Sequence, residues 1–301
     1  MSLNSYTSPI KPSDVETIRA ILDEAGFEFK DKPYAHFSAK KGKLNVTVYE
    51  KGPKVLVQGK ETEDFVKFTL EPMVLGEAKL GYEEVNQPDM FEPHFGIDES
   101  GKGDFFGPLV IAGVYTDASS TRALMDSGVM DSKRITSAAK IAKLADIIRK
   151  TRGVKYDVVS IGPESYNRLY GSFKNLNRLL AWGHSKVIAN LAEQVPNCPR
   201  ALSDQFARKE VLERELKKHG VNLELQQRTK GESDVAVAAA SILARERFVQ
   251  WIDQSSDKSG VKIPLGAGPH VIDAARELIT SHGDEILPKV AKMHFKTAQE
   301  V

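Results

Sequence analysis

The sequence predicts two folded units, a small α+β unit followed by a larger mixed α/β unit. The 301 residues are enough for about two domains of ordinary size. Alternating apolar positions separated by glycine turns dominate residues 34–58, whereas long helical patterns between short apolar runs dominate the second part of the chain. A glutamate-rich stretch with Pro88 and Pro93 separates the two patterns.

The N-terminal unit is predicted to contain a helix, a three-stranded meander and a second helix. Apolar residues recur at helical spacing over 12–26, with Ser13 as the N-cap. The alternating segments 34–39, 44–49 and 54–58 predict an antiparallel meander. A second helix is expected over roughly 62–75. We therefore expect a first domain at residues 1–76 and a linker at 77–93.

Residues 94–301 are predicted to form a mixed sheet surrounded by helices. Strands are expected at 95–97, 109–115 and 154–161, with shorter ones at 201–203 and 221–226. Helices are expected at 138–150, at 164–194 with a break near Gly171, and at 207–219, 234–252 and 271–281. This mixture of strands and helices is typical of an α/β domain.

Composition excludes several classes of protein. The 42 basic and 41 acidic residues give a formal charge of +1, which by itself argues against coating of a polyanion by bulk attraction. The longest apolar run, 235–244, is too short for a membrane span of about 20 residues. The single cysteine, Cys198, cannot form an internal disulfide or a cysteine-rich zinc site. Because residues 1–10 lack a secretory pattern, we expect a cytoplasmic protein without membrane contact.

The most informative motif is the adjacent pair Asp98 and Glu99, followed by Gly101-Lys102-Gly103. Two carboxylates at the end of an apolar strand place oxygen ligands beside a turn whose backbone can approach another molecule closely. An isolated Asp-Glu pair is more often a solvated strand end. The Gly-Lys-Gly turn alone lacks the spacing of a nucleotide-binding loop.

Further acidic residues follow or precede apolar segments. Asp204 follows the short run 201–203, where it can belong to a site or cap the helix at 207–219. Glu232 precedes the Ala-rich helix, where acids commonly interact with the helix dipole. The small residues of that helix predict tight packing against the sheet.

The recurrence of these acids near strand ends predicts a shared site. Two carboxylates about 4 Å apart repel by roughly 4 kcal/mol at an effective dielectric of 20, so a cluster of them needs cations. Oxygen ligands without cysteine or histidine favour Mg²⁺ or Mn²⁺. Two such ions about 3.5 to 4 Å apart align the attacking and leaving oxygens of a phosphodiester, which predicts phosphoryl transfer to water.

The motifs, in their order and spacing, resemble ribonuclease HIII, one of the type 2 ribonucleases H. The residues that carry the resemblance are Asp98-Glu99-Ser100-Gly101-Lys102-Gly103, Asp131-Ser132-Lys133, Asp204-Gln205-Phe206, Lys230-Gly231-Glu232 and Ala238-Ala239-Ala240-Ser241-Ile242. Residues 55–60 resemble the family's appended domain, which is similar to half of a TATA-box-binding protein. The resemblance implies a ribonuclease H-like fold and cleavage of the RNA strand of an RNA–DNA hybrid, leaving 5′-phosphate and 3′-hydroxyl ends.

The resemblance also implies a Mg²⁺ or Mn²⁺ site. Asp98, Glu99 and Asp204 would be metal ligands, and Glu232 would be the fourth catalytic carboxylate. The chain is one residue shorter than the family pattern after Lys230, so Asp234 competes with Glu232 for the fourth position.

The glycine turn has an implied role in substrate recognition. The backbone of Gly101-Lys102-Gly103 would lie along the minor groove and read the 2′-hydroxyls of RNA. Type 2 enzymes carry Gly-Arg-Gly at this place, and the lysine favours ribonuclease HIII over ribonuclease HII. Two alternatives stay open: ribonuclease HII-like cleavage at single embedded ribonucleotides, and hybrid binding without catalysis.

Several weaker candidates surround these motifs. Residues 131–134 can bind phosphates or begin a capped helix. Asn177 and His184 share a helix face, for which ordinary packing is favoured over substrate contact. His94 and His294 have no ligand-like spacing and stay unassigned.

The N-terminal unit is expected to bind the hybrid. Over residues 30–60, eight lysines face two acids, and aromatic residues are interleaved with them. Lys40, Lys41 and Lys43, near one turn, are the expected contacts. The alternative is an oligomerisation or folding module. Over residues 61–99, eleven acids oppose two lysines, so the near-neutral total hides separated basic and acidic segments. We expect a monomer.

Overall fold

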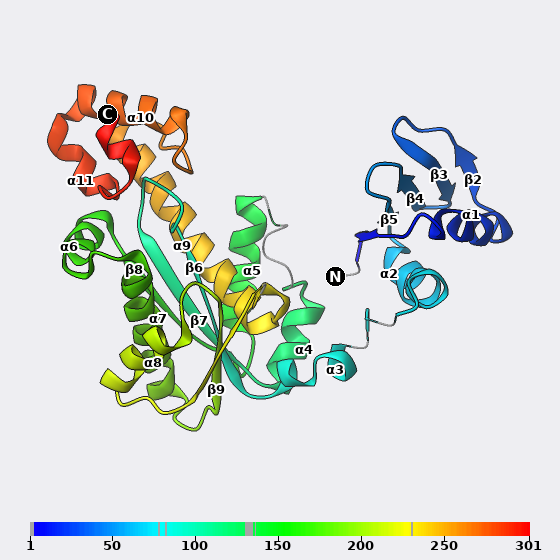
Figure 1. Cartoon of the computed structure of the whole chain (residues 1–301), viewed down its shortest axis with the longest axis horizontal. Helices are drawn as coiled ribbons and strands as arrows, with labels where there is room; N and C mark the ends of the chain where they lie inside the picture. The colour runs from blue at the N-terminus through cyan, green and yellow to red at the C-terminus, as the bar shows by residue number, and fades with distance from the viewer. Residues whose placement is uncertain (1–2, 78, 82, 130–134, 136, 230) are drawn as a thin grey trace. The chain divides into compact units, whose positions relative to one another are not determined.

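The chain folds into two compact units that divide between Pro88 and Asp89 (Figure 1). The computed structural model describes residues 3–77, 79–81, 83–129, 135, 137–229 and 231–301. The division falls inside the segment 77–93 that the sequence predicts as a linker.

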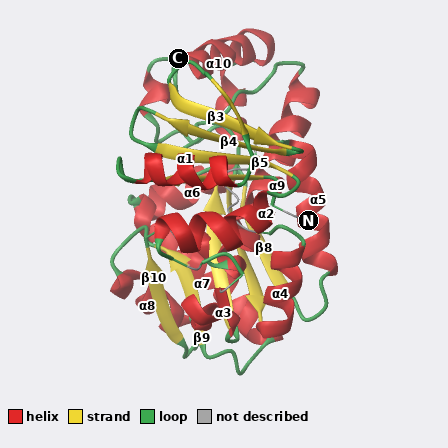
Figure 2. Ribbon diagram, turned by 90° about the vertical axis from the view of Figure 1, so that its right-hand side faces the viewer, coloured by secondary structure: helices red, strands yellow, loops and turns green. Residues whose placement is uncertain are grey.

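The first unit is a five-stranded antiparallel sheet covered on one face by helices. The strand order is β1-β5-β4-β3-β2. The strands are β1 (Ser5–Pro9), β2 (Glu28–Lys30), β3 (Ala35–Lys41), β4 (Leu44–Tyr49) and β5 (Lys54–Gly59). The helical elements are α1 (Asp14–Glu24), α2 (Thr62–Phe65) and the π-helix η1 (Val66–Leu75). Figure 2 shows β3, β4 and β5 side by side, and alternate residues of these strands pack with the helices into one hydrophobic core.

Two edge strands and a widened helix distinguish this unit from the prediction. Strands β1 and β2 are short and largely polar, so they carry little of the alternating apolar signal that identifies a strand. The helix expected at 62–75 begins as α2 but continues as a π-helix that contains Pro72. A proline inside a helix removes one hydrogen-bond donor and obstructs regular α-helical bonding, which suits a wider turn.

Both ends of the segment between the units are anchored. The buried carboxylate of Glu71 accepts hydrogen bonds from the backbone N–H groups of Lys79 and Leu80, at 2.7 and 2.9 Å. At the other end, the Arg200 guanidinium donates to the carbonyl of Asp89, whose carboxylate also pairs with Arg228. The short helices α3 (Glu83–Asn86) and η2 (Pro88–Phe91) lie in this segment.

The second unit contains a five-stranded mixed sheet between two layers of helices. The strand order is β10-β9-β6-β7-β8, with β6 parallel to β9 and antiparallel to β7. The strands are β6 (His94–Ser100), β7 (Leu109–Thr116), β8 (Lys155–Ile161), β9 (Arg200–Asp204) and β10 (Glu224–Arg228). The longer helices are α4 (Ala118–Asp126), α5 (Ala138–Lys150), α6 (Pro163–Phe173), α7 (Leu176–Gln194), α8 (Lys209–Lys218), α9 (Val235–Ser259) and α10 (Pro269–His282). The C-terminal part adds η5 (Asp284–Ile286), α11 (Leu287–Val290) and η6 (Lys296–Gln299).

Glycines in the two central strands let helices approach the sheet from both sides. Helix α9 packs on one face of β6 and β7, and α7 packs on the other (Figure 1). A Cβ atom on Gly96 of β6 would lie 2.2 Å from the backbone of α9. A Cβ atom on Gly113 of β7 would lie 2.5 Å from Val187 of α7. The sheet therefore separates two core clusters, one on the α9 side and one on the α7 side.

Most elements of the second unit lie close to the predicted ones. The helix break expected near Gly171 falls between Phe173 and Leu176, and three further differences concern β6, α4 and α9. Strand β6 extends through Ser100, so Asp98 and Glu99 lie inside a strand and not after it. Helix α4 is additional; it begins with a capping box in which the side chain of Asp117 and that of Ser120 bond reciprocally to the backbone. Helix α9 continues to Ser259, beyond its expected end at residue 252. None of the helices in the described part of the chain has the length and apolarity needed to cross a membrane.

Candidate active site

The end of strand β6 presents carboxylates to both faces of the sheet. Asp98 and Glu99 are consecutive residues of β6, and successive side chains of a strand alternate between faces. Their partners agree with this alternation. The Asp98 side chain bonds to Ser241 of α9, whereas the Glu99 side chain bonds to His184 of α7.

Burial determines the electrostatics of Asp98. Removal from water, together with the negative charge of Glu99, raises the pKa of Asp98 to about 6, although the hydrogen bond from Ser241 acts in the opposite direction. The two ionised carboxylates are therefore held against their mutual repulsion. A bound cation would relieve that repulsion.

Glu99 is held in place by two cationic or hydrogen-bonding partners. Burial raises the pKa of Glu99, but the hydrogen bond and charge of His184, with the charge of Lys102, outweigh burial and lower it overall. His184 Nε2 lies 3.1 Å from Glu99 Oε2, and Lys102 Nζ lies 3.4 Å from Glu99 Oε1. The Glu99 carboxylate is thus oriented by His184 of α7 and by Lys102 of the glycine turn.

His184 is a site residue that the sequence pattern undervalues. It is fully buried, its ring centroid lies 4.6 Å from that of Phe206, and its Nδ1 atom has no hydrogen-bond partner among the described residues. Asn175, in contrast, caps helix α7 by accepting a hydrogen bond from the Arg178 N–H group. The available signal was a histidine inside the buried stripe of an amphipathic helix, which by itself indicates packing more often than function.

Strand β9 brings Asp204 beside Asp98. The parallel register pairs Ile97 with Ser203, so one further step places Asp204 opposite Asp98 at the usual interstrand spacing of about 4.8 Å. Asp204 does not cap the following helix, because α8 begins at Lys209. Its Oδ1 atom accepts a hydrogen bond from the Gly231 N–H group at 3.3 Å.

The hydrogen bond between Gly231 and Asp204 places the η4 turn (Gly231–Ser233) beside the end of β9. Glu232 lies in this turn, directly after Gly231. Lys230 lies outside the described residues. The backbone of the turn is therefore adjacent to Asp204.

Asp234, the alternative to Glu232, already has a full set of partners. It is the N-cap of α9, and its Oδ1 atom accepts hydrogen bonds from the N–H groups of Ala236 and Val237 at 2.9 and 3.2 Å. His94 Nε2 lies 3.0 Å from both carboxylate oxygens, and both side chains are buried. This engagement favours Glu232 as the fourth carboxylate.

The donor set suits a hard divalent cation. Asp98, Glu99 and Asp204 offer only oxygen atoms, the ligands that Mg²⁺ and Mn²⁺ prefer. Within the described part of the chain, no three acidic, histidine or cysteine side chains already surround one point. Mg²⁺ commonly retains several waters and uses few carboxylates, so an open carboxylate group beside a substrate surface fits such an ion.

The glycine turn after β6 has two glycines with different structural requirements. Gly101 has a φ of +87°, and a Cβ atom there would lie 2.2 Å from the Pro108 carbonyl oxygen. Packing therefore requires glycine at this position. A Cβ atom on Gly103 would meet no atom within 4 Å, so packing within the chain does not require glycine there. Lys102 lies between them, with its side chain 40% exposed.

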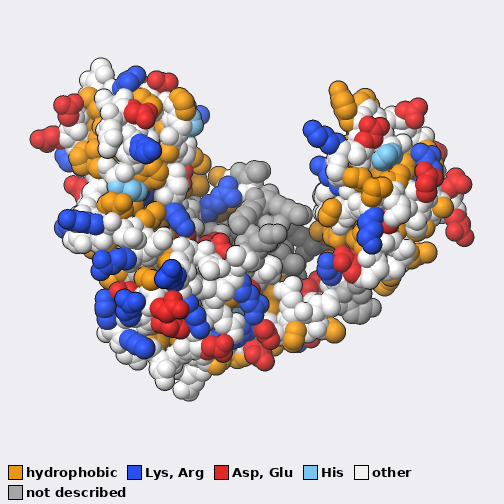
Figure 3. Space-filling view, in the orientation of Figure 1, with side chains coloured by type: hydrophobic (Ala, Val, Ile, Leu, Met, Phe, Trp, Pro, Cys, Tyr) orange, Lys and Arg blue, Asp and Glu red, His pale blue; other side chains and the backbone are white. Residues whose placement is uncertain are grey.

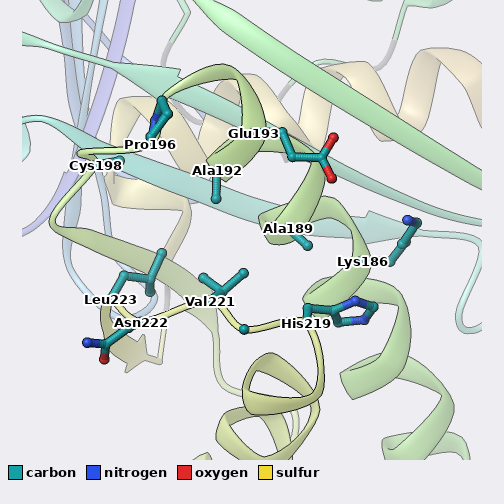
Figure 4. Close-up of a pocket in the computed structure, with 11 residues that line it drawn as sticks. Lys186, Ala189, Ala192, Glu193, Pro196, Cys198, His219, Val221, Asn222 and Leu223 are labelled. Atoms are coloured by element: carbon teal, nitrogen blue, oxygen red, sulfur yellow. The ribbon is translucent and has the colours of Figure 1, made fainter.

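Two further features of the sequence are the segment 131–134 and the single cysteine. Residues 131–134 are outside the described part of the chain. Cys198 lines a pocket of about 320 Å³ between α7 and the connection from α8 to β10, together with Lys186, Glu193 and His219 (Figure 4). Burial raises the pKa of the Cys198 thiol to about 11, which makes it a poor nucleophile. This pocket contains none of the candidate carboxylates.

Two of the lysines predicted as contacts, Lys40 and Lys41, point to opposite faces of the N-terminal sheet. Lys40 belongs to a row across all five strands, whose other members are Glu28, Asn45, Gln58 and Ser5. The helices cover the opposite face. Lys41 points toward that covered face, where its Nζ atom donates to the Ala25 carbonyl at 2.6 Å. Of the two lysines, Lys40 is therefore the better placed to contact a ligand on the exposed face. The amide and hydroxyl side chains of the row are further candidates for such contacts.

Comparisons with known proteins match both units. Residues 95–298 match the family model described as Ribonuclease HII, and residues 9–73 match the model described as Domain of unknown function (DUF3378). Ribonuclease HIII of Chlamydia pneumoniae is 44% identical over 298 residues, which cover 98% of this chain and 97% of the relative.

Solved structures distinguish between the two type 2 enzymes. Bst-RNase HIII in complex with Mn²⁺ matches with a TM-score of 0.67 at 28% identity and covers 98% of this chain and 97% of that one. The RNase HII in the PCNA:RNase HII complex from Archaeoglobus fulgidus matches with a TM-score of 0.56 at 31% identity, but covers only 68% of this chain and 95% of that one. Because ribonuclease HIII proteins match both units, this chain belongs to the ribonuclease HIII family.

Proposed function

We propose that this protein hydrolyses the RNA strand of RNA–DNA hybrids, leaving 5′-phosphate and 3′-hydroxyl ends. The observation that supports the proposal is that Asp98 and Glu99 lie near the end of β6 and Asp204 at the end of the neighbouring strand β9, next to the glycine turn. A protein that only binds a polyanion gains nothing from such a cluster of negative charge. A phosphodiesterase that uses divalent cations requires it.

The candidate carboxylates have complementary roles in this proposal. Asp98, Glu99 and Asp204 would hold Mg²⁺ or Mn²⁺, with Glu232 as the fourth carboxylate. When bound, a pair of such ions supplies positive charge that activates water for attack and stabilises the departing 3′ oxygen. His184 and Ser241 would orient Glu99 and Asp98 for this role through their hydrogen bonds.

The turn at 101–103 would contact the sugar edge of the RNA strand. The open space around Gly103 supports this role, because packing within the chain does not explain a glycine at that position. A backbone without a side chain can lie against a shallow minor groove and bond to its 2′-hydroxyls.

Gly103→Ala is expected to raise the KM for a hybrid by roughly tenfold or more, because a methyl group would displace the substrate from its aligned position. The melting temperature should stay unchanged, since the residue does not have a left-handed φ and its surroundings are open. Gly171→Ala, another substitution into open space in helix α6, is the matched control and should leave KM unchanged. An unaltered KM in Gly103→Ala would contradict the role of the turn.

Substrate choice separates this proposal from its two rivals. The native protein is offered a continuous RNA–DNA hybrid and, separately, a DNA duplex with one embedded ribonucleotide, each with Mg²⁺ or Mn²⁺. Cleavage of the hybrid with much slower cleavage of the second duplex supports the proposal. Comparable rates on both would indicate a ribonuclease HII-like activity. Binding of the hybrid without cleavage would indicate a non-catalytic binder.

The N-terminal unit would supply affinity for the hybrid. Four members of the row, Ser5, Gln58, Asn45 and Lys40, offer hydroxyl, amide and ammonium donors, and the fifth, Glu28, is an acid at its end. Such donors position a nucleic-acid backbone without reading its sequence. Basic and acidic side chains are interspersed on the faces visible in Figure 3, so a uniformly basic field does not explain binding. We infer that local contacts from this row account for binding of the hybrid by the N-terminal unit.

Removal of residues 1–88 is expected to raise the KM for a hybrid by at least about tenfold, because a second tethered binding surface increases overall affinity. The kcat should change little, since every candidate carboxylate lies in the second unit, which has its own hydrophobic cores. Lys40→Ala in the full chain should reproduce part of the effect, whereas Lys41→Ala should not. An unchanged KM in the truncated protein would count against this role.

We place this activity in a monomer in the cytoplasm. All candidate carboxylates belong to a single unit of one chain, so the site needs no second copy. The only cysteine is buried and free, which suits a reducing compartment.

A further inference from the structure

The second unit contains a fully buried lysine that the proposed chemistry does not use. Lys292 has no exposed surface, and its Nζ atom donates hydrogen bonds to the carbonyl oxygens of Asp104 and Phe106, at 2.8 and 3.1 Å. Nζ also lies 5.8 Å from the ring centroid of Tyr166 and 6.0 Å from that of Phe248. Burial lowers the pKa of Lys292 to about 7, and the two hydrogen bonds offset part of the cost of removing its amine from water.

These hydrogen bonds hold the segment that follows the glycine turn, residues 104–107. The Lys292 N–H group donates to the Phe105 carbonyl at 2.8 Å, between the two carbonyls bound by its side chain. The Gly107 N–H group donates to the Val290 carbonyl at 2.8 Å. Three consecutive carbonyl groups, those of residues 104–106, are therefore held by one residue of the C-terminal segment.

A second loop holds the same backbone from another side. The Gly266 N–H group donates to Asp104 Oδ1 at 2.6 Å, and the Phe105 N–H group donates to the Gly266 carbonyl at 2.9 Å. The backbone from Asp104 to Gly107 is thus bound on two sides. The preceding turn is packed against Pro108 and Phe248 at Gly101 but is open around Gly103, so the position of its second half depends on this bound segment.

We propose that Lys292 is a positioning residue for hybrid binding, which holds the carbonyl groups of Asp104 and Phe106 so that the Gly101–Gly103 turn keeps the position required by the RNA strand. This inference rests on the proposed function of the turn. Lys292 itself does not contact the substrate. Its loss would release the end of the turn and weaken substrate binding while the carboxylates stay in place.

Lys292→Met tests the inference, because methionine keeps the length and apolar stem but removes the donors. We expect the KM for a hybrid to rise at least about tenfold, with kcat within about threefold of the native value, since small displacements of positioning groups have large effects. Hydrogen exchange of the Phe105, Gly107 and Gly266 amides should accelerate, while the amides of β7 keep their protection. Leu212→Ala, in the core cluster on the other side of the sheet, is the control for a comparable loss of stability and should leave KM unchanged.

A second variant keeps the test decisive if Lys292→Met does not fold. Lys292→Gln retains an NH₂ group with two donors on a shorter stem, so its KM should lie between those of the native protein and of a variant without donors. Unchanged KM and amide exchange in a folded variant at position 292, with KM raised in Gly103→Ala, would overturn the inference and leave the proposed function standing. Unchanged KM in both would reject the binding role of the turn itself.

Discussion

Asp98→Asn is expected to reduce cleavage of an RNA–DNA hybrid by roughly a thousandfold. Asparagine keeps the shape of the side chain and an oxygen for the Ser241 hydrogen bond, but it removes the charge that would hold a cation. Cations supply several kcal/mol of transition-state stabilisation in phosphodiester hydrolysis, which corresponds to about three powers of ten in rate. The measurement is single-turnover cleavage with Mg²⁺ or Mn²⁺ in excess.

The same substitution should leave the metal-free protein at least as stable as the native one. Burial and the charge of Glu99 disfavour the ionised form of Asp98, so an uncharged amide removes an unfavourable interaction from the folded state. Mn²⁺ should raise the melting temperature of the native protein, because a ligand that binds the folded state stabilises it, and should raise that of Asp98→Asn much less.

Asp146→Asn, which changes an exposed acid on α5, is the matched control and should behave as the native protein does in both measurements. Cleavage by Asp98→Asn at the native rate would show that the site has been assigned wrongly.

The sequence predicts the elements that bury an apolar stripe and misses those that do not. Helix α5 and strand β4 match the predicted bounds because their apolar residues follow helical and alternating periods. Strand β1 and helix α4 are mostly polar, and their stability comes from pairing with β5 and from a capping box. Such contacts are set by the tertiary fold, so periodicity cannot reveal them.

The chemistry of the site could be predicted from residue types, but its geometry could not. The pair Asp98 and Glu99 was visible as two carboxylates near a turn. Their separation to opposite faces depends on β6 continuing through Ser100, which pairing with β7 determines. His184 is 85 residues from Glu99 in the sequence, and only the packing of α7 against the sheet brings them together.

The structure adds most to the sequence in the choice between Glu232 and Asp234 as the proposed fourth carboxylate. Glu232 and Asp234 are two residues apart, and spacing alone leaves both possible. The hydrogen bonds of Asp234 to the first turn of α9 and to His94 give it a structural role. Substitution of Glu232 should therefore reduce cleavage, whereas substitution of Asp234 should reduce stability.

Glu232→Gln is expected to reduce hybrid cleavage by roughly a hundredfold or more, with a melting temperature close to the native value, because it removes a charge proposed for catalysis and keeps the size of the side chain. Asp234→Ala should instead lower stability by about 2 to 4 kcal/mol, since it removes an N-cap and leaves the buried His94 without its partner. That loss corresponds to a fall in melting temperature on the order of 10 °C.

Activity measured well below the melting temperature of each variant separates these effects. There, Asp234→Ala should retain cleavage close to the native rate, whereas Glu232→Gln should not. Asp234→Asn, which keeps an oxygen that can cap α9, should recover much of the stability lost in Asp234→Ala. If Asp234→Asn abolished cleavage while Glu232→Gln retained it, Asp234 would be the fourth carboxylate, and its hydrogen bonds to α9 would have to coexist with a catalytic role.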